Sequence, residues 1–231
     1  MSTMSDDPSQ GAIMGLTELM VQGAIAPTDI AQVFQGTTTA TNAVLEARGA
    51  RAGMITNEGF CDVLHIGRPQ RPDHYSIMQE IPWQNRPLIK RRYRKSVLGR
   101  LLPPTDEELE PLDEAAIRQA ACELKADGVE AVAIYFLFSH PNLVHENRTR
   151  AIVAKEIPDA FVTTSSDTSP QFREFERFTT AALATFVGPK VGSYVKSLDA
   201  AFKDQKISGD LRIMASYGGV VTHRMVTRTS H

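Results

Sequence analysis

Apolar positions recur along this chain with two different periods, and the period changes several times from one end to the other. Apolar residues at helical spacing predict an amphipathic helix that residues 6–9 introduce and Gly23 ends. The clearest helix is predicted over residues 111–126, with Gly128 as its C-terminal cap. Residues 129–138 form an unbroken apolar run, which is typical of a strand covered on both faces.

The remaining segments continue this alternation. Strands are predicted over residues 30–34, 50–56, 161–165 and 211–215, a strand or hairpin over 88–102, and helices over 43–47, 60–65, 144–157 and 172–203. The alternating order predicts an α/β fold with a mostly parallel sheet and helices on both faces.

Three local features of this pattern carry further expectations. The first two strands are expected to lie side by side, joined by a right-handed crossover through the helix between them. Gly188-Pro189 is expected to break or kink the last helix. The proline-rich segment 67–87 predicts a long irregular excursion, and such loops are more often functional than idle.

Composition narrows the classes of protein. The chain has 25 basic and 27 acidic residues, a net charge of −2, and therefore no overall field for nucleic acid or an anionic membrane. The basic run 90–95 is followed by the acidic segment 106–110, so a nucleic-acid partner is not expected.

The N-terminus is too polar for a secretory signal, and no apolar run is long enough to span a membrane. The two cysteines indicate a reducing compartment, which we interpret as the cytoplasm.

A hydroxyl-rich segment lies where the first predicted strand passes into a helix. Backbone N–H groups at such a turn favour an anion, and threonine hydroxyls add donors, so a phosphate or carboxylate could bind here. The alternative is a capped helix start without a ligand. The Gly-Lys-Ser/Thr ending of a P-loop is absent. The candidate cofactor-binding residues are Gly36, Thr37, Thr38, Thr39, Thr41 and Asn42.

The proline-stiffened loop after residue 65 gathers arginine, histidine and acidic side chains. Arg68 and Arg71 could recognise a carboxylate or phosphate, and His with Asp73 could move protons or bind a metal. The histidine spacing matches no standard zinc site, so the metal ligands stay unassigned. The alternative is a solvated loop with structural arginine pairs.

Three more segments are candidates by position. His145 follows the apolar strand and lies near an expected carboxyl edge, or else Asn142 caps the helix and His145 lies on its surface. Glu174 and Arg177 belong to a charged helix start, for which a solvated face is the expected interpretation. After the last strand, Ser216, Gly218 and Gly219 would let backbone approach a ligand closely, or form a plain turn.

These segments together resemble the A-type subunit of the hydantoinase/oxoprolinase family. The resemblance covers roughly residues 5–221 and rests on five stretches in the family's order: QGTTTATNAVLEARGAR, NEGFCDVLHIGRPQRPDHYSI, GVEAVAIYFLFSHPNLVHE, SPQFREFERFTTAALATFVGPKV and SYGGV. Family members include ATP-dependent 5-oxoprolinases, N-methylhydantoinases, and acetone or acetophenone carboxylases.

The resemblance implies half of an actin-like ATPase fold, in which ATP with Mg²⁺, or another divalent metal, activates an amide or carbonyl oxygen. The Thr-rich segment and the glycine turn would then line the nucleotide or substrate cleft. Arg68, Arg71 and Asp73 would line the catalytic site together with His145, which Glu174 and Arg177 support. A B-type subunit, or further parts of the same enzyme, would complete the reaction on a small cyclic amide or ketone.

The resemblance also implies a fold that is incomplete at both ends. Family members begin with a Gly-Gly-Thr-Phe-Thr-Asp phosphate loop and continue into a second actin-like half, and neither segment is found in this sequence. We therefore expect little ATPase activity from the isolated chain. The expected domains are a polar arm (1–10), an N-terminal-type α/β region (11–208), the start of a second domain (209–222) and an unrelated tail (223–231).

Three hypotheses about function follow from these expectations. The leading one is a subunit of an ATP-dependent hydrolase or carboxylase that is inactive alone. The second is a non-catalytic fragment or assembly module, for which apolar surfaces without their missing halves make an oligomer reasonable. The third, a complete small enzyme using His65, Asp73 and His74, requires those side chains to converge in one pocket.

Overall fold

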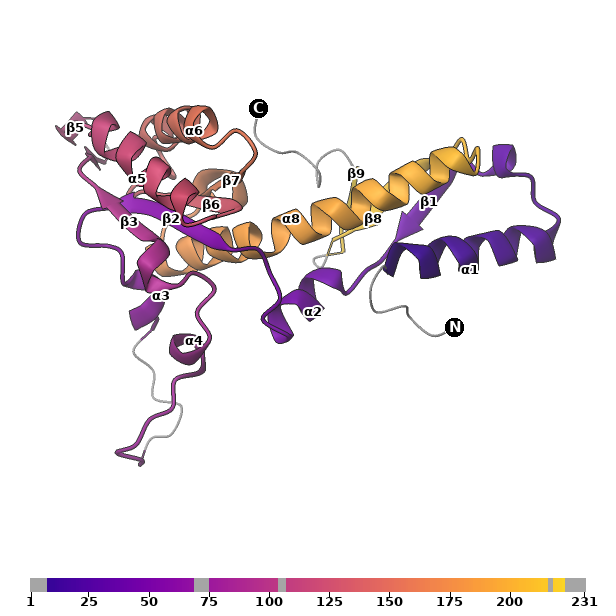
Figure 1. Cartoon of the computed structure of the whole chain (residues 1–231), viewed down its shortest axis with the longest axis horizontal. Coiled ribbons are helices and arrows are strands. Elements are labelled where there is room, and N and C mark those ends of the chain that lie inside the picture. Colours follow the sequence, from indigo (N-terminus) through magenta and orange to yellow (C-terminus); the bar gives the residue numbers. More distant parts are fainter. Residues whose placement is uncertain (1–7, 69–74, 104–106, 216–217, 223–231) are drawn as a thin grey trace. The chain divides into compact units, whose positions relative to one another are not determined.

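The computed structural model describes residues 8–68, 75–103, 107–215 and 218–222, and it divides into two compact units (Figure 1). Within the described ranges, one unit comprises residues 8–45 together with 190–222, and the other comprises residues 46–189. We call them unit 1 and unit 2. The predicted tail 223–231 and the candidates Arg71, Asp73 and Ser216 lie outside the described residues.

Unit 2 is built on a four-stranded parallel sheet. Its strands are β2 (Ala52–Asn57), β3 (Arg94–Val97), β6 (Ala131–Tyr135) and β7 (Phe161–Thr164), in the order β3-β2-β6-β7. Every residue of the two central strands is buried. This burial explains why β6 is continuously apolar rather than alternating, and why β2 is apolar up to its last two residues, Thr56 and Asn57.

Helices cover both faces of this sheet. Helices α5 (Glu114–Ala126) and α6 (Val144–Glu156) pack on one face, and the first turns of α8 (Glu174–Asp204) pack on the other (Figure 1). Tyr135 of β6 marks the second face, because its ring stacks on Phe178 of α8 with centroids 4.1 Å apart. The predicted α/β fold with a mostly parallel sheet is therefore confirmed.

Helix α5 shows how closely the local sequence determines an element here. The side chain of Asp113 accepts a hydrogen bond from Ala116 N at 2.9 Å and caps the helix start. Its apolar stripe, with Ile117 and Leu124, is fully buried. Gly128 follows the helix with φ +69°, the left-handed conformation that suits a C-terminal glycine.

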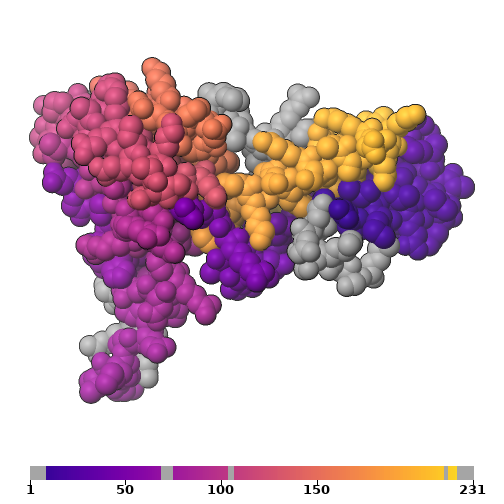
Figure 2. All heavy atoms as spheres, viewed as in Figure 1, coloured from indigo at the N-terminus to yellow at the C-terminus, as the bar shows by residue number. Residues whose placement is uncertain are grey.

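The remaining elements of unit 2 are short. They are α3 (Val63–Ile66), α4 (Pro82–Asn85), η2 (Arg91–Tyr93), α7 (Ser165–Thr168) and the antiparallel pair β4 (Arg100–Leu102) and β5 (Glu107–Glu110). Residues 75–81 of the expected excursion contain no helix or strand, and Tyr75 and Ile77 there are each 99% exposed. In Figure 2 this part of the chain projects from the rest of unit 2. The basic run at residues 90–95 is partly ion-paired, because Arg91 and Arg94 both contact the carboxylate of Asp62.

Unit 1 has a separate sheet, in the order β1-β8-β9. Strand β1 (Gln32–Gln35) lies parallel to β8 (Asp210–Met214), and β9 (Val220–Thr222) returns antiparallel. The other elements are α1 (Pro8–Gly23), η1 (Pro27–Asp29), α2 (Thr39–Leu45) and the last turns of α8. Met20 of α1 and Leu198 of α8 belong to the core against this sheet.

Two expectations about these elements are wrong. Strand β1 does not pair with β2; its partner is β8, about 180 residues later in the chain, in a different sheet. Of the expected break or kink at Gly188-Pro189, the break is wrong, since Pro189 lies inside the continuous helix Glu174–Asp204. One turn before the proline, the Thr185 hydroxyl donates to the carbonyl of Ala181 at 2.8 Å.

Within the described residues, none of the helices has the length and apolar character needed to cross a membrane.

Candidate functional site

The carboxyl edge of the unit 2 sheet holds a buried polar cluster centred on Glu146 of α6. Glu146 is fully buried, and its carboxyl group accepts hydrogen bonds from two backbone N–H groups and three hydroxyls. The backbone donors are Phe136 and Ser166, and the hydroxyls are those of Ser139, Ser165 and Ser166, at 2.5 to 3.1 Å. Glu146 thereby ties the end of β6 to the end of β7.

Arg177 of α8 lies beside this cluster and is also fully buried. It donates to the carbonyl of Phe136 at 2.8 Å and lies 3.0 Å from Nδ1 of His140. Burial lowers the pKa of the Arg177 guanidinium, and the charge of Glu146 acts in the opposite direction. The expectation of a solvated charged face is therefore wrong for Arg177, which anchors the helix to the edge of the sheet.

Asn57, the last residue of β2, joins three strand ends. Its side chain donates to the carbonyl of Gly99 and accepts from Leu137 N at 2.6 Å. Only 4% of the residue is exposed, so these contacts are shielded from water. Because Gly99 follows β3 and Leu137 follows β6, a single amide fixes the carboxyl ends of three neighbouring strands.

The predicted residues of unit 2 that the structure describes make their main side-chain contacts with different partners. Arg68 forms an exposed ion pair with Glu176, through Nε at 2.9 Å, and that bond lowers the pKa of the Glu176 carboxyl. His145 is 1% exposed, so it does not lie on the helix surface, and its Nε2 is 2.8 Å from Oε1 of Glu108. Glu174 begins α8 and is partly buried.

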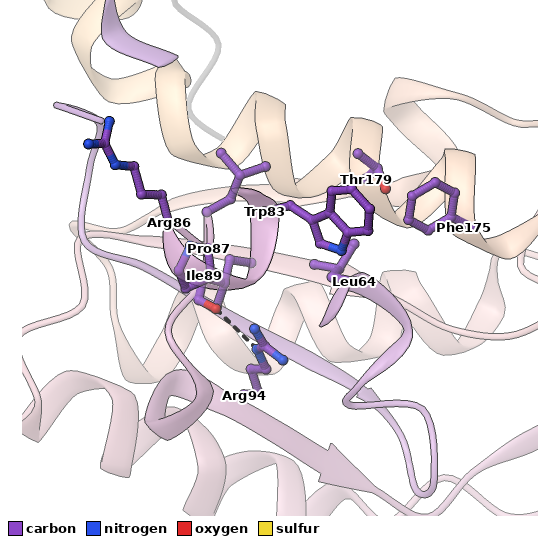
Figure 3. Close-up of a pocket in the computed structure, with 9 residues that line it drawn as sticks. Leu64, Trp83, Arg86, Pro87, Ile89, Arg94, Phe175 and Thr179 are labelled. Atoms are coloured by element: carbon purple, nitrogen blue, oxygen red, sulfur yellow. Dashed lines mark hydrogen bonds between the residues drawn. The ribbon is translucent and has the colours of Figure 1, made fainter. Parts of the chain in front are cut away.

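A small apolar pocket of about 100 Å³ lies between the excursion and α8 (Figure 3). Leu64 of α3 and Trp83 of α4 line it on one side, and Phe175 and Thr179 of α8 line it on the other (Figure 3). The indole N–H of Trp83 donates to the carbonyl of His65 at 3.1 Å, which fixes the ring. The pocket is therefore a packing junction that holds the excursion against α8.

In unit 1, two of the predicted cofactor segments meet. Strands β1 and β8 are parallel neighbours, with Gln35 opposite Ile213, so their carboxyl ends lie at one edge of the sheet. The Thr-rich turn leaves β1 at Gly36, and the turn through Gly218 and Gly219 leaves β8. A Cβ at Gly36 would lie 3.9 Å from the sulfur of Met214, the last residue of β8, so the Thr-rich turn begins beside the end of the strand that the glycine turn follows.

The side chains of this turn are arranged around the start of α2. The hydroxyls of Thr37 and Thr39 are 2.7 Å apart, and Thr37 also accepts from the backbone N–H of Thr39. Thr38 and Thr41 are exposed, and Nδ2 of Asn42 lies 3.5 Å from the Thr38 hydroxyl. The turn thus presents exposed hydroxyls at the carboxyl edge of a parallel pair, where open α/β sheets bind ligands. Among the residues described, no three His, Cys, Asp or Glu side chains group closely enough to hold a metal ion.

The residues with the strongest polar contacts in unit 2 were selected only in part. Ser139, His140 and Glu146 belong to the candidate segment 139–146, from which only His145 was given a role. Asn57, Ser165 and Ser166 were not selected. Glu146 looks like an ordinary acidic residue in a first helical turn, because its donors come from distant segments. The available signal was positional: each residue follows a predicted strand or begins the next helix.

Comparisons with known proteins agree with this fold. Caprolactamase subunit alpha of Pseudomonas jessenii is 33% identical over 187 residues, which are 81% of this chain and 27% of that subunit. A crystal structure of the ATP-dependent caprolactamase from the same organism superimposes with a TM-score of 0.77 at 29% identity, over 92% of this chain and 30% of that chain. A nucleotide-free acetone carboxylase structure gives a TM-score of 0.84 at 24% identity, over 99% of this chain and 34% of that one, and it supports the fold alone.

The chain spans less than a third of the length of the curated relatives that it matches. The hydantoinase/oxoprolinase N-terminal region matches residues 1–157, from α1 through the central strands of unit 2 to the end of α6. With a match over more than half of its length and a resemblance carried by five ordered segments, this chain belongs to the hydantoinase/oxoprolinase family.

Proposed function

We propose that this chain is part of an ATP-dependent enzyme that activates the carbonyl oxygen of a cyclic amide or a ketone. The single observation that carries the proposal is the meeting of the Thr-rich turn and the glycine turn at the carboxyl edge of β1 and β8. This is the position at which parallel α/β sheets bind ligands. Family membership supplies the reaction class, because the relatives include ATP-dependent caprolactamase and acetone carboxylase.

In this proposal the turn between β1 and α2 contacts the nucleotide. The exposed hydroxyls of Thr38 and Thr41 would donate to phosphate oxygens, while Thr37 and Thr39 hold the turn in shape through their mutual hydrogen bond. Gly218 has φ +86° and leaves open space where a Cβ would stand, so backbone can approach a ligand there. Residues Gly36, Asn42, Ser216 and Gly219 complete the proposed contact.

Bound ATP would supply a phosphoryl group to the substrate oxygen and so make it a leaving group. Mg²⁺ would accompany the phosphates, since nucleotide-bound Mg²⁺ takes most of its ligands from phosphate oxygens and water. Arg68, with Arg71 and Asp73, is the proposed contact for the substrate. His145, Glu174 and Arg177 would act as positioning residues, consistent with the buried contacts of His145 and Arg177.

The proposal includes a partner. The caprolactamase relative is one subunit of a larger enzyme by its name, and this chain matches 27% of it. We propose a B-type subunit, or further segments of the same enzyme, as the source of the missing part of the active site. The cytoplasm remains the proposed location.

Calorimetric titration with Mg-ATP and with a non-hydrolysable analogue tests the nucleotide contact. We expect saturable binding that Thr38→Ala weakens about fivefold, the typical effect of one lost hydrogen bond. Thr28→Ala is the matched control, because Thr28 is also exposed but precedes β1 and lies away from the carboxyl edge. Absence of binding in a folded sample, or equal affinities for both variants, would favour an assembly module without a nucleotide site.

A further inference from the structure

The strand order of unit 2 creates a switch point between β2 and β6. The chain leaves β2 toward β3 on one side and leaves β6 toward β7 on the other side. The first connection lies on the α8 face, since Leu64 of α3 lines a pocket with Phe175 and Thr179 of α8. The second passes through α6, which packs with α5 on the opposite face. Neighbouring connections that leave on opposite faces open a crevice, where α/β sheets bind ligands.

A cavity of about 220 Å³ is found at this switch point. Its walls come from four segments of the chain. They are residues 57–60 at and after the end of β2, residues 98–100 from the end of β3 to the start of β4, Glu110 of β5, and Leu137 after β6. The cavity is smaller than the roughly 300–1,000 Å³ that drug-sized ligands occupy. Its ligand is therefore a small metabolite rather than a nucleotide.

The walls of this cavity are held in place before any ligand arrives. The amide of Asn57 bridges Gly99 and Leu137, so the three strand ends cannot separate without breaking buried hydrogen bonds. At Gly59 the backbone has φ +82°, and a Cβ there would meet no atom within 4 Å. The wall is thus open at Gly59, where backbone can approach a ligand as closely as at Gly218.

The charged side chains of the wall have both signs. Arg100 is partly exposed, and no carboxylate within the described residues lies at ion-pair distance from it. Glu58 and Glu110 are exposed, and neither forms an ion pair with described residues. Arg100 and Glu110 are opposite each other in the register of β4 and β5, so groups of both signs lie close together in the wall. A ligand with a single charge is attracted by one of these groups and repelled by the other, whereas a ligand with both charges can place each one beside its complement. Phe60, Leu98 and Leu137 add apolar surface between these charges.

We propose that the switch-point cavity of unit 2 binds a small zwitterion of the amino-acid type with an apolar side chain. Arg100 receives the carboxylate, because guanidinium groups match carboxylates in geometry and charge. Glu58 and Glu110 receive the ammonium group. The apolar walls receive the side chain. The cavity lies in unit 2 and the proposed nucleotide contact lies in unit 1, so each proposal can fail without the other.

The test is a ligand-observed NMR titration of the full chain with three probes of nearly equal shape. Leucine carries both charges, 4-methylpentanoate lacks the ammonium group, and 3-methylbutylamine lacks the carboxylate. We expect leucine to bind at least about tenfold more tightly than either single-charge probe, the scale of one charge-assisted hydrogen bond.

Variants assign the charges to residues. Arg100→Gln should weaken leucine about tenfold or more, and Glu58→Gln should weaken leucine while leaving 4-methylpentanoate unchanged or tighter. Arg118→Gln is the control, since Arg118 is an exposed arginine of α5 that pairs with Glu114. Circular dichroism confirms that each variant is folded.

Two results would overturn the proposal. One is leucine binding that is absent or equal to that of 4-methylpentanoate, which would leave at most a simple anion site. The other is leucine binding that survives both Arg100→Gln and Glu58→Gln, which would place the ligand elsewhere.

Discussion

Glu146 and Ser166 are joined by two hydrogen bonds to one carboxylate oxygen: Oε2 accepts from Ser166 N at 2.9 Å and from Ser166 Oγ at 2.6 Å. Both residues are buried, and they belong to different segments, the start of α6 and the short helix α7. The other oxygen of Glu146 accepts from Ser139, Ser165 and the backbone of Phe136. One side chain therefore organises the loops at the carboxyl edge of unit 2.

Replacing this carboxyl group should be costly. In Glu146→Gln the new amide N–H₂ faces hydroxyl and backbone donors, so at least one buried donor loses its acceptor. We expect the free energy of unfolding to fall by about 2–3 kcal/mol. Urea unfolding followed by circular dichroism measures this change. Glu156→Gln, in the same helix but partly exposed, is the control and should change stability by less than about 0.5 kcal/mol.

The contrast between these two glutamates shows what the sequence can and cannot predict. Helix α6 was predicted because its boundaries are local: a turn precedes it and Pro158 follows it. The role of Glu146 depends on Ser139, Ser165 and Ser166, which only the parallel pairing of β6 with β7 brings together. Glu146 and Glu156 therefore look alike in the sequence and differ completely in burial.

Strand pairing marks the same limit for the fold. The central strand β6 was predicted because a doubly covered strand has a continuous apolar sequence. The partner of β1 was predicted wrongly, since its pairing with β8 joins residues about 180 positions apart and leaves no local signal. That same pairing brings the Thr-rich turn to the glycine turn, a proximity that the sequence alone did not contain.

Asn57 should be essential to the carboxyl edge. Asn57→Ala removes the acceptor for Leu137 N–H and the donor for the Gly99 carbonyl, and both groups stay buried. We expect a loss of about 2–4 kcal/mol in the free energy of unfolding, because two buried polar groups become unpaired. Asn57→Asp keeps the acceptor but turns a second oxygen toward the Gly99 carbonyl and buries a charge, so it should also lower the free energy of unfolding. Asn147→Ala, at an exposed position of α6, should change little; an equal loss there would contradict this account.

His140 should make stability depend on pH. Burial lowers the pKa of His140 below its ordinary 6.5, the nearby Arg177 charge lowers it further, and Glu174 opposes both. Since Arg177 donates toward Nδ1, neutral His140 accepts that hydrogen bond and carries its proton on Nε2.

The sign follows from proton linkage. At pH values between the lowered pKa of folded His140 and 6.5, the unfolded chain binds more protons than the folded chain. The stability that neutral His140 contributes is therefore fully present above about pH 6.5, and it declines as the pH falls through that window. Urea unfolding between pH 5 and 8 should show this slope, and His140→Gln should remove it. NMR titration of the His140 ring should give a value below 6.5; a value above 6.5 would contradict the geometry.

Two glycines of helix α8 should respond in opposite ways to the same substitution. Alanine favours helix over glycine by roughly 1 kcal/mol, so Gly→Ala in a helix normally stabilises. A Cβ at Gly192 would meet no atom within 4 Å, and Gly192→Ala should raise the free energy of unfolding by about 0.5–1 kcal/mol. A Cβ at Gly188 would overlap the ring of Phe161, so Gly188→Ala should lower the free energy of unfolding by about 1–3 kcal/mol.

The clash at Gly188 can be isolated by a second substitution. Phe161→Leu removes the ring that the new Cβ would overlap, and it also removes some of the packing between β7 and α8. In that background Gly188→Ala should cost much less, or become favourable, and a double-mutant cycle measures the difference as the energy of the clash. Thermal and urea unfolding of the four proteins give the cycle. Equal costs in both backgrounds would mean that Gly188 is required for the helix backbone beside Pro189, rather than for space against Phe161.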